Sequence, residues 1–288
     1  KFLRPQCFEY NIEKEKNAPF LSIGKNMQSI QINAIPILTD NYVWTIQTKT
    51  GLCLIDPGEA SPVQRWLSNQ RLTPSTILIT HHHSDHVGGV ETLKKYYPNI
   101  TIYGPQHSLP FECTDTQSIA EFTDPVTQLK WQTHRTPGHT LDHICYQTGH
   151  HLFCGDLLFL AGCGRLFEGT AEQMYGSIQA ITQLPKSTLL YPAHEYSLSN
   201  LIFAAHVEPN NPIIQDEIKR CNDRRDRQLP TLPTNIQQEL NINPFLRLNS
   251  PEVYQFATQS PYYSPPKHPS HKTTALFSSL RQAKDHYP

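Results

Sequence analysis

From residue 29 onward, short apolar runs alternate with turn residues, a pattern typical of strands in an α/β domain. Residues 76–80 (TILIT) predict a buried strand, and residues 90–97 predict an amphipathic helix that ends before Pro98. Residues 61–69 predict a short helix with Ser61 as its N-cap and Pro62 at its first position. The same criteria predict strands at 29–37, 42–48, 52–55, 101–103, 126–131, 144–147, 152–154 and 188–191, and a helix at 171–183.

Beyond residue 195 the spacing of apolar residues becomes helical throughout. Helices are expected at 199–207, 211–228, 234–240, 251–259 and 273–284. The Pro-rich segment 260–271 (SPYYSPPKHPSH) predicts a loop. We therefore expect three parts: an N-terminal extension at 1–28 without clear periodicity, an α/β domain at 29–195 and an all-α domain at 196–288.

The balance of charge narrows the classes of function. Of the 288 residues 38% are hydrophobic and 17% are charged, which is apolar enough for a buried core. The formal net charge is −1, so the basic excess typical of proteins that bind nucleic acid or an anionic membrane surface is missing. No run approaches the ~20 apolar residues that span a bilayer. Seven cysteines without CxxC spacing match neither a disulfide framework nor a thiolate zinc site, and with no secretory signal they predict a cytoplasmic protein.

Fifteen histidines raise the question of where they cluster, because imidazole is the commonest metal ligand. His81 and His83 directly follow the predicted strand at 76–80, and they can point the same way because side chains alternate along an extended segment. Asp85 and His86 come one turn later and can face a second point. A His-rich run alone is often a solvated loop, but the fixed spacing HxHxDH predicts ligands for two nearby metal ions.

Three further candidate ligands lie downstream, each at the end of a predicted strand or in a turn. They are His139, Asp156 and His194. Small or rigid residues precede each one, as a tight turn that aims a ligand into a cleft requires. The donors are nitrogen and carboxylate oxygen without sulfur, which suits zinc, iron or manganese at a hydrolytic centre rather than a closed structural zinc site.

The motifs HHHSDH, PGH, CGD and AHEY, in this order, resemble the metallo-β-lactamase superfamily, and the finer detail is similar to its glyoxalase II (hydroxyacylglutathione hydrolase) family. The resemblance runs from about residue 29 to residue 284. The C-terminal matches carry the narrower assignment, because the other branches lack this helical domain. The supporting stretches are Thr39-Asp40-Asn41-Tyr42, Gly138-His139-Thr140 with His143-Ile144-Cys145-Tyr146, Ala161-Gly162-Cys163-Gly164, Phe167-Glu168-Gly169-Thr170, His194-Glu195-Tyr196, Ala205-His206-Val207-Glu208-Pro209 and Asn243-Pro244-Phe245.

The resemblance implies an αββα sandwich with metal ions at one edge, followed by a C-terminal all-α domain that completes the substrate site. It implies two divalent ions, zinc first and iron or manganese as alternatives, with Asp156 and Asp85 acting in catalysis. The implied ligands are His81, His83 and His139 for one ion, Asp85, His86 and His194 for the other, and Asp156 as the bridge between them.

The implied chemistry follows from the charge of the metal ions. Two cations lower the pKa of a shared water, so that hydroxide forms near neutral pH and attacks a thioester carbonyl. The implied substrate is S-D-lactoylglutathione or a related 2-hydroxyacyl thioester, and the products are glutathione and D-lactate, in the second step of methylglyoxal detoxification. A small-molecule substrate is the only partner expected, without nucleic acid or membrane, and we expect a monomer.

Glutathione carries two carboxylates, so its site is expected to offer cations. Arg281 and Lys284 stand three residues apart on the last predicted helix and match the family's basic pair for the glycine carboxylate, although a solvated helix face is the alternative. Tyr196 matches the family's substrate tyrosine, with a packed aromatic as the alternative. The chain departs from the family at Arg165 and Phe167, where Lys and Tyr are common. Arg still binds carboxylate bidentately, but Phe lacks a hydroxyl.

Two more carboxylates lie near predicted ligands. Asp56, in a turn after the strand at 52–55, is a candidate for holding a ligand histidine from behind, with a plain turn aspartate as an equally supported alternative. Asp142 is expected in a solvated turn, with a role behind a metal ligand as the less favoured alternative.

Two other functions are weighed against thioester hydrolysis: a persulfide dioxygenase of the same superfamily with one iron ion, and a non-catalytic metal-binding module. The dioxygenase branch typically does not use the full second-metal set and lacks the helical domain. A binding module would usually have lost ligands, and all seven ligand positions are occupied here.

Overall fold

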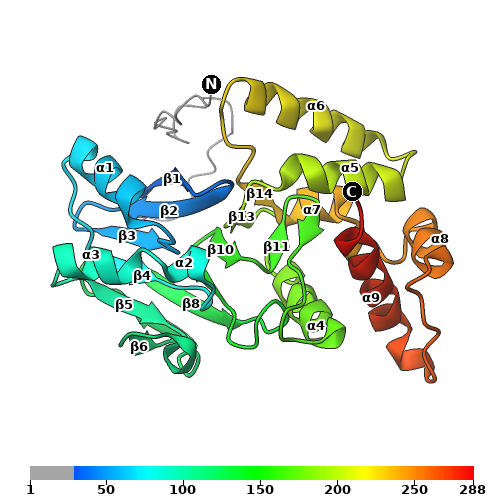
Figure 1. Ribbon diagram of the computed structural model, residues 1–288, viewed down its shortest axis with the longest axis horizontal. Coiled ribbons are helices and arrows are strands. Elements are labelled where there is room, and N and C mark those ends of the chain that lie inside the picture. Colours follow the sequence, from blue (N-terminus) through cyan, green and yellow to red (C-terminus); the bar gives the residue numbers. More distant parts are fainter. Residues whose placement is uncertain (1–28) are drawn as a thin grey trace. The chain divides into compact units, whose positions relative to one another are not determined.

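The computed structural model describes residues 29–288, which form two compact units that divide between residues 132 and 133 (Figure 1). The N-terminal extension expected at 1–28 lies outside the described residues. Among residues 29–288, no helix is both long and apolar enough to cross a membrane.

A six-stranded mixed sheet with the strand order β1-β2-β3-β4-β5-β6 forms the frame of the first unit. The first three strands pair antiparallel, and the pairs from β3 to β6 are parallel. Every residue of β3 and β4 is buried, which explains why these strands are continuous apolar runs. The strands are β1 (Gln31–Ile37), β2 (Asn41–Gln47), β3 (Leu52–Ile55), β4 (Thr76–Leu78), β5 (Thr101–Gly104) and β6 (Thr114–Asp115).

Two helices, α1 (Ala60–Gln70) and α3 (Val90–Tyr96), bury apolar residues in the same core as this sheet. The expectation that Ser61 caps α1 is wrong, because the helix begins two residues earlier, at Ala60, and Glu59 is its N-cap. The first-turn N–H groups of a helix have no intrahelical acceptor, so Pro62 is tolerated anywhere in that turn and does not fix the cap. The unit also contains the short helices α2 (Ser84–Val87) and η2 (Gln106–Ser108).

The prediction of a strand at 126–131 is wrong for the first half of that range. The carboxylate of Asp124 accepts hydrogen bonds from the backbone N–H groups of Val126 (2.9 Å) and Thr127 (2.6 Å), and these bonds close a turn. Gln128 then takes a positive φ of 60°. The strand itself, β8 (Lys130–Arg135), begins after the turn and pairs antiparallel with β7 (Glu121–Thr123).

A second six-stranded sheet has the order β14-β13-β10-β9-β8-β7, and the division between the units passes through β8. β10 pairs antiparallel with β9 and parallel with β13. A short two-stranded hairpin, β11–β12, stands outside this sheet. The remaining strands are β9 (Ile144–Thr148), β10 (His151–Gly155), β11 (Leu158–Phe159), β12 (Gly162–Cys163), β13 (Leu189–Pro192) and β14 (Thr234–Asn235).

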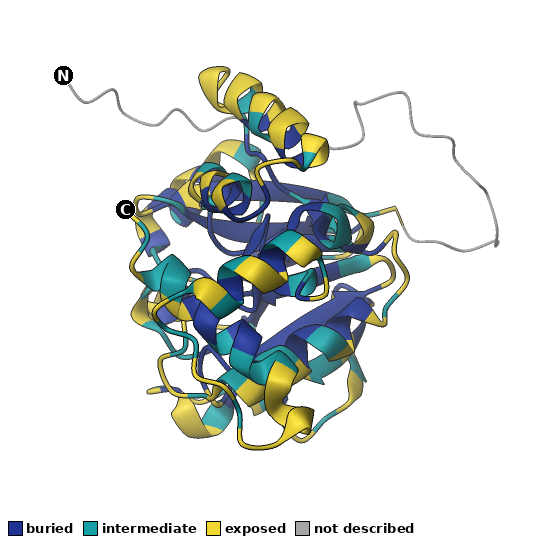
Figure 2. Cartoon of the chain, turned by 90° about the vertical axis from the view of Figure 1, so that its right-hand side faces the viewer, coloured by how far each residue is buried: buried dark blue, intermediate teal, exposed yellow. Residues whose placement is uncertain are grey.

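The helices α4, α5, α7, α8 and α9 of the second unit share one apolar core with β9, β10 and β13. Thr170 begins the first of them with a capping box to Gln173, and Asn211 caps α6 just before a proline. Figure 2 shows the result: strands are mostly buried, whereas helices turn one buried side inward and one exposed side to solvent. The helices are α4 (Ala171–Thr182), α5 (Ser197–Val207), α6 (Pro212–Asp226), α7 (Ile236–Ile242), η3 (Pro244–Leu246), α8 (Pro251–Gln259), η4 (Pro269–His271) and α9 (Lys272–Asp285).

Candidate metal centre and substrate site

Four of the predicted ligands lie on the segment that leaves β4 and enters α2. His81 and His86 are buried, while His83 and Asp85 are half-buried. The Nε2 atom of His81 lies 3.0 Å from Nδ1 of His83, and Nε2 of His86 lies 3.5 Å from Oδ2 of Asp85. The first unit therefore presents its donor atoms in two pairs, as the spacing of the motif predicts.

Asp56 holds this segment from behind, so the interpretation of Asp56 as an orienting residue is confirmed. Its Oδ1 accepts the backbone N–H of Thr80 (2.8 Å), and its Oδ2 lies 3.0 Å from Nδ1 of His86. With the proton on Nδ1, the lone pair of His86 is on Nε2, the atom that lies near Asp85. The backbone at Gly58 passes so close to that of Asp85 that only glycine fits, because a Cβ at residue 58 would lie 1.7 Å from the carbonyl oxygen of Asp85.

In the second unit, Asp156 lies between two predicted histidine ligands. Its Oδ2 is 3.4 Å from Nε2 of His139, and its Oδ1 is 3.4 Å from Nε2 of His194. The Nδ1 atom of His139 lies 2.8 Å from the carbonyl oxygen of Arg165, which fixes the tautomer with its lone pair on Nε2. One carboxylate that faces a different imidazole with each oxygen has the arrangement of a bridging ligand.

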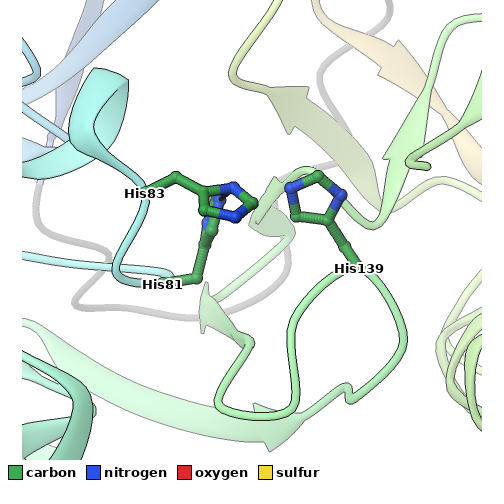
Figure 3. A group of neighbouring side chains, drawn as sticks. All are labelled: His81, His83 and His139. Atoms are coloured by element: carbon green, nitrogen blue, oxygen red, sulfur yellow. Dashed lines mark hydrogen bonds between the residues drawn. The ribbon is translucent and has the colours of Figure 1, made fainter. Parts of the chain in front are cut away.

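Donor atoms gather in groups of three in which all atoms lie within 4.8 Å of one another. Figure 3 shows one of these groups, with the rings of His81, His83 and His139 pointing toward one another. The donors are imidazole nitrogen and carboxylate oxygen without thiolate, which fits a divalent metal ion at a hydrolytic site. Three of the four such groups among the described residues together contain all seven predicted ligands: His81, His83 and His139; His81, His86 and Asp156; Asp85, His86 and His194. The fourth consists of His82, Asp142 and Glu168.

The predicted substrate cations are brought together around one carboxylate. Oδ1 of Asp285 lies 3.1 Å from the guanidinium of Arg281 and 3.4 Å from Nε of Arg165. Arg281 is buried and donates to the carbonyl oxygen of Cys163 (2.7 Å). Burial, together with Arg281 and Arg165, lowers the pKa of Lys284 to about 8. The low value results first from burial of the ammonium and then from the two neighbouring guanidinium groups, and Asp285 opposes it.

The two predicted aromatic substrate residues each lie against a histidine that is a predicted metal ligand. Tyr196 is half-buried and stacks on His194, with ring centroids 4.6 Å apart. Phe167 is 62% exposed and meets the ring of His139 edge-on at 5.2 Å.

Three features of this region do not follow from the sequence reasoning. Asn41 donates to Oδ2 of Asp85 (2.9 Å). In the sequence, only its place in the TDNY stretch marks Asn41 as a candidate. Phe159 meets the rings of both His194 and Tyr196 edge-on, and no motif marks it. Asp142 is buried and accepts a hydrogen bond from the hydroxyl of Thr140, so the expectation of a solvated turn is wrong because a neighbouring donor satisfies the carboxylate.

Comparison with known proteins places the chain in a family. Residues 195–287 match the model described as Hydroxyacylglutathione hydrolase C-terminus, and residues 38–112 and 113–194 match the Metallo-beta-lactamase superfamily. A protein from Erwinia tasmaniensis named hydroxyacylglutathione hydrolase is 42% identical over 261 residues, which cover 90% of this chain and all of that protein. One of the same name from Edwardsiella ictaluri is 43% identical over 256 residues, covering 88% and 98%.

Solved structures show the same fold at low sequence identity. ETHE1 from Myxococcus xanthus aligns with a TM-score of 0.59 at 24% identity and covers 87% of this chain and 98% of that one. A metallo-beta-lactamase from Staphylococcus aureus aligns with a TM-score of 0.58 at 19% identity, covering 90% and 72%. The predicted fold class, an α/β metallo-β-lactamase fold with a C-terminal helical region, is confirmed. The chain belongs to the hydroxyacylglutathione hydrolase family of the metallo-β-lactamase superfamily.

Proposed function

We propose that the protein hydrolyses glutathione thioesters, converting S-D-lactoylglutathione and water to glutathione and D-lactate. The observation that carries the proposal is the carboxylate of Asp156, which faces His139 with one oxygen and His194 with the other, each at 3.4 Å. A cluster of Arg165, Arg281 and Lys284 in the same unit supplies the positive charge that the carboxylates of glutathione need.

The metal assignment is part of the proposal. Two divalent ions would be held here, zinc in the first place and iron or manganese as alternatives, and Asp156 would be a ligand common to both. The proposed ligands are His81, His83 and His139 for the first ion and Asp85, His86 and His194 for the second. Such ions would supply Lewis acidity, which lowers the pKa of water and stabilises negative charge on an attacked carbonyl.

The chain's own residues orient these ligands and hold the substrate. Asp56 fixes the proton of His86 on Nδ1, and the carbonyl of Arg165 does the same for His139. Arg281 and Lys284 bind the glycine carboxylate of glutathione, while Tyr196 and Phe167 line the approach beside the ligand histidines. Glutathione leaves as a thiolate, which is a weaker base than an alkoxide or amine, so no strong general acid is required.

The proposal also covers the domains, the oligomeric state and the cellular compartment of the protein. Residues 29–195 form the catalytic domain and residues 196–288 the helical substrate-binding domain. The protein is proposed to be a monomer in the cytoplasm, and the six free cysteines among the described residues support the reducing compartment. A persulfide dioxygenase or a non-catalytic module is not favoured, because residues 195–287 match the hydrolase C-terminal model and every ligand position is filled.

The experiment is to follow loss of the thioester bond in S-D-lactoylglutathione with zinc-loaded protein, and to run lactoyl-coenzyme A beside it. We expect rapid turnover of the glutathione thioester, slow turnover of the coenzyme A thioester, and loss of both after chelation. Equal rates with the two thioesters would contradict the assigned carrier, and turnover that survives chelation would contradict the metal mechanism.

A further inference from the structure

The loop of the β11–β12 hairpin is held by polar side chains from helical elements far along the chain. Asn200 of α5 donates to the carbonyl of Leu160 (3.1 Å). Asn243, directly after α7, donates to the carbonyl of Gly162 (2.9 Å). Glu239 of α7 accepts the backbone N–H of Ala161 (2.8 Å). The loop thus has its backbone groups satisfied by side chains rather than by water or a neighbouring strand.

Glu239 is the centre of this arrangement and is fully buried. Its Oε2 accepts from Ala161 and from the amide of Asn243 (2.9 Å), and its Oε1 accepts from the hydroxyl of Thr234 (2.7 Å). A buried carboxylate is costly unless its oxygens are hydrogen-bonded, and a packed apolar side chain would give stability more cheaply. Neither the Glu239 carboxylate nor the Asn243-Pro244-Phe245 stretch that contains its partner has a role in the proposed hydrolysis described above.

The same hairpin and its flanks contact the proposed site at three points. Phe159 packs edge-on against His194 and Tyr196, at 5.8 and 5.2 Å between ring centroids. The carbonyl of Cys163 accepts from Arg281 (2.7 Å). Two residues further on, the carbonyl of Arg165 accepts from His139 (2.8 Å). Any shift of the hairpin therefore moves the supports of two metal ligands and one substrate cation together.

We propose that Glu239 and Asn243 are positioning residues, which clamp the β11–β12 hairpin so that its side chains and carbonyls hold His139, His194 and Arg281 in place. The inference rests on the proposed function, since it assumes that these histidines bind metal. Ala161, whose N–H the carboxylate accepts, has a positive φ of 55°. A non-glycine residue favours this conformation only where surrounding contacts hold it, and Glu239 supplies such a contact.

The test compares Glu239→Leu with Thr234→Val at pH 8. Leu fills a similar volume but has no acceptor, so the N–H of Ala161 and the amide of Asn243 both lose their contact with residue 239. Val removes one hydrogen bond to the same carboxylate and leaves both contacts of Oε2 intact. Thermal unfolding of both variants separates a loss of stability from a loss of positioning. The other measurements are the affinity for Co²⁺ by competition with a chelator, the visible absorption of the cobalt protein, and kcat and KM.

We expect Glu239→Leu to lower metal affinity and kcat by roughly tenfold, as loss of groups behind metal ligands typically does, and to change the cobalt absorption bands. Thr234→Val is expected to keep the parent values. If Glu239→Leu is less stable yet keeps the parent affinity and spectrum, or if Thr234→Val changes them equally, the clamp has no positioning role. Asn243→Ala, which removes the bond to Gly162 without removing the charge, serves if Glu239→Leu does not fold.

The two proposals fail in different ways. A parent protein that binds no metal, or that binds metal without hydrolysing the thioester, contradicts the proposed function. A parent protein that does both, beside a Glu239→Leu variant with unchanged metal affinity, contradicts only the clamp.

Discussion

Lys284 ties substrate binding to pH at the scale of a single side chain. Its pKa of about 8 results from burial and from the nearby Arg281 and Arg165, so its charge is lost as pH rises through about 8. If this ammonium binds a substrate carboxylate, kcat/KM for the glutathione thioester falls over that range, because kcat/KM reports groups of the free enzyme. Initial rates between pH 7 and 9 measure the effect. Lys284→Arg, which stays charged, removes the fall, and a fall that persists in this variant would assign it to another group.

Asp156 is the residue on which the metal assignment depends most. Asp156→Ala removes a carboxylate that faces His139 with one oxygen and His194 with the other. We expect activity to fall by orders of magnitude and the metal content per chain to decrease, measured by steady-state kinetics and elemental analysis. Normal turnover with a normal metal content in this variant would show that Asp156 is not the bridge.

At the scale of elements, the turn before β8 is predicted to stabilise the first unit. Asp124 is fully buried and accepts hydrogen bonds from the hydroxyl of Thr76 in β4 and from two backbone N–H groups. Asp124→Ala leaves these donors without their acceptor, which costs about 3 kcal/mol in the free energy of unfolding. Urea denaturation measures the loss. The proposed site lies elsewhere, so kcat of the folded protein is expected to stay at the parent value, and a collapse of kcat at unchanged stability would contradict this division.

The same turn shows where sequence reasoning succeeds and where it fails. Continuous apolar runs such as β3 and β4, and helices that begin with a proline, such as α8, are marked by local patterns and were predictable. The start of β8 depends on the side chain of Asp124, and strands of two residues such as β11 and β12 are too short for any periodicity. Fixed spacing identified the candidate ligands, whereas Phe159 and Asn41 act through contacts between distant segments that no local pattern encodes.

At the scale of the whole molecule, Glu239 makes stability depend on pH. Burial raises the pKa of Glu239 to about 7, while in the unfolded chain a glutamate titrates near 4.3. Between these values the folded state binds a proton that the unfolded state does not, so the free energy of unfolding falls as pH rises through this window. Stability measured in urea at pH 5 and at pH 7.5 is expected to fall more for the parent than for Glu239→Gln. An equal fall in both would show that the carboxyl titrates normally.

The most direct test of the whole account is a titration of metal-free protein with Zn²⁺ while hydrolysis of S-D-lactoylglutathione is followed. The proposed division of seven ligands between two ions, with Asp156 common to both, predicts that turnover is negligible without metal and reaches its plateau at two ions per chain. Turnover by the metal-free protein, or none with two ions bound, would contradict the assignment of a binuclear thioester hydrolase.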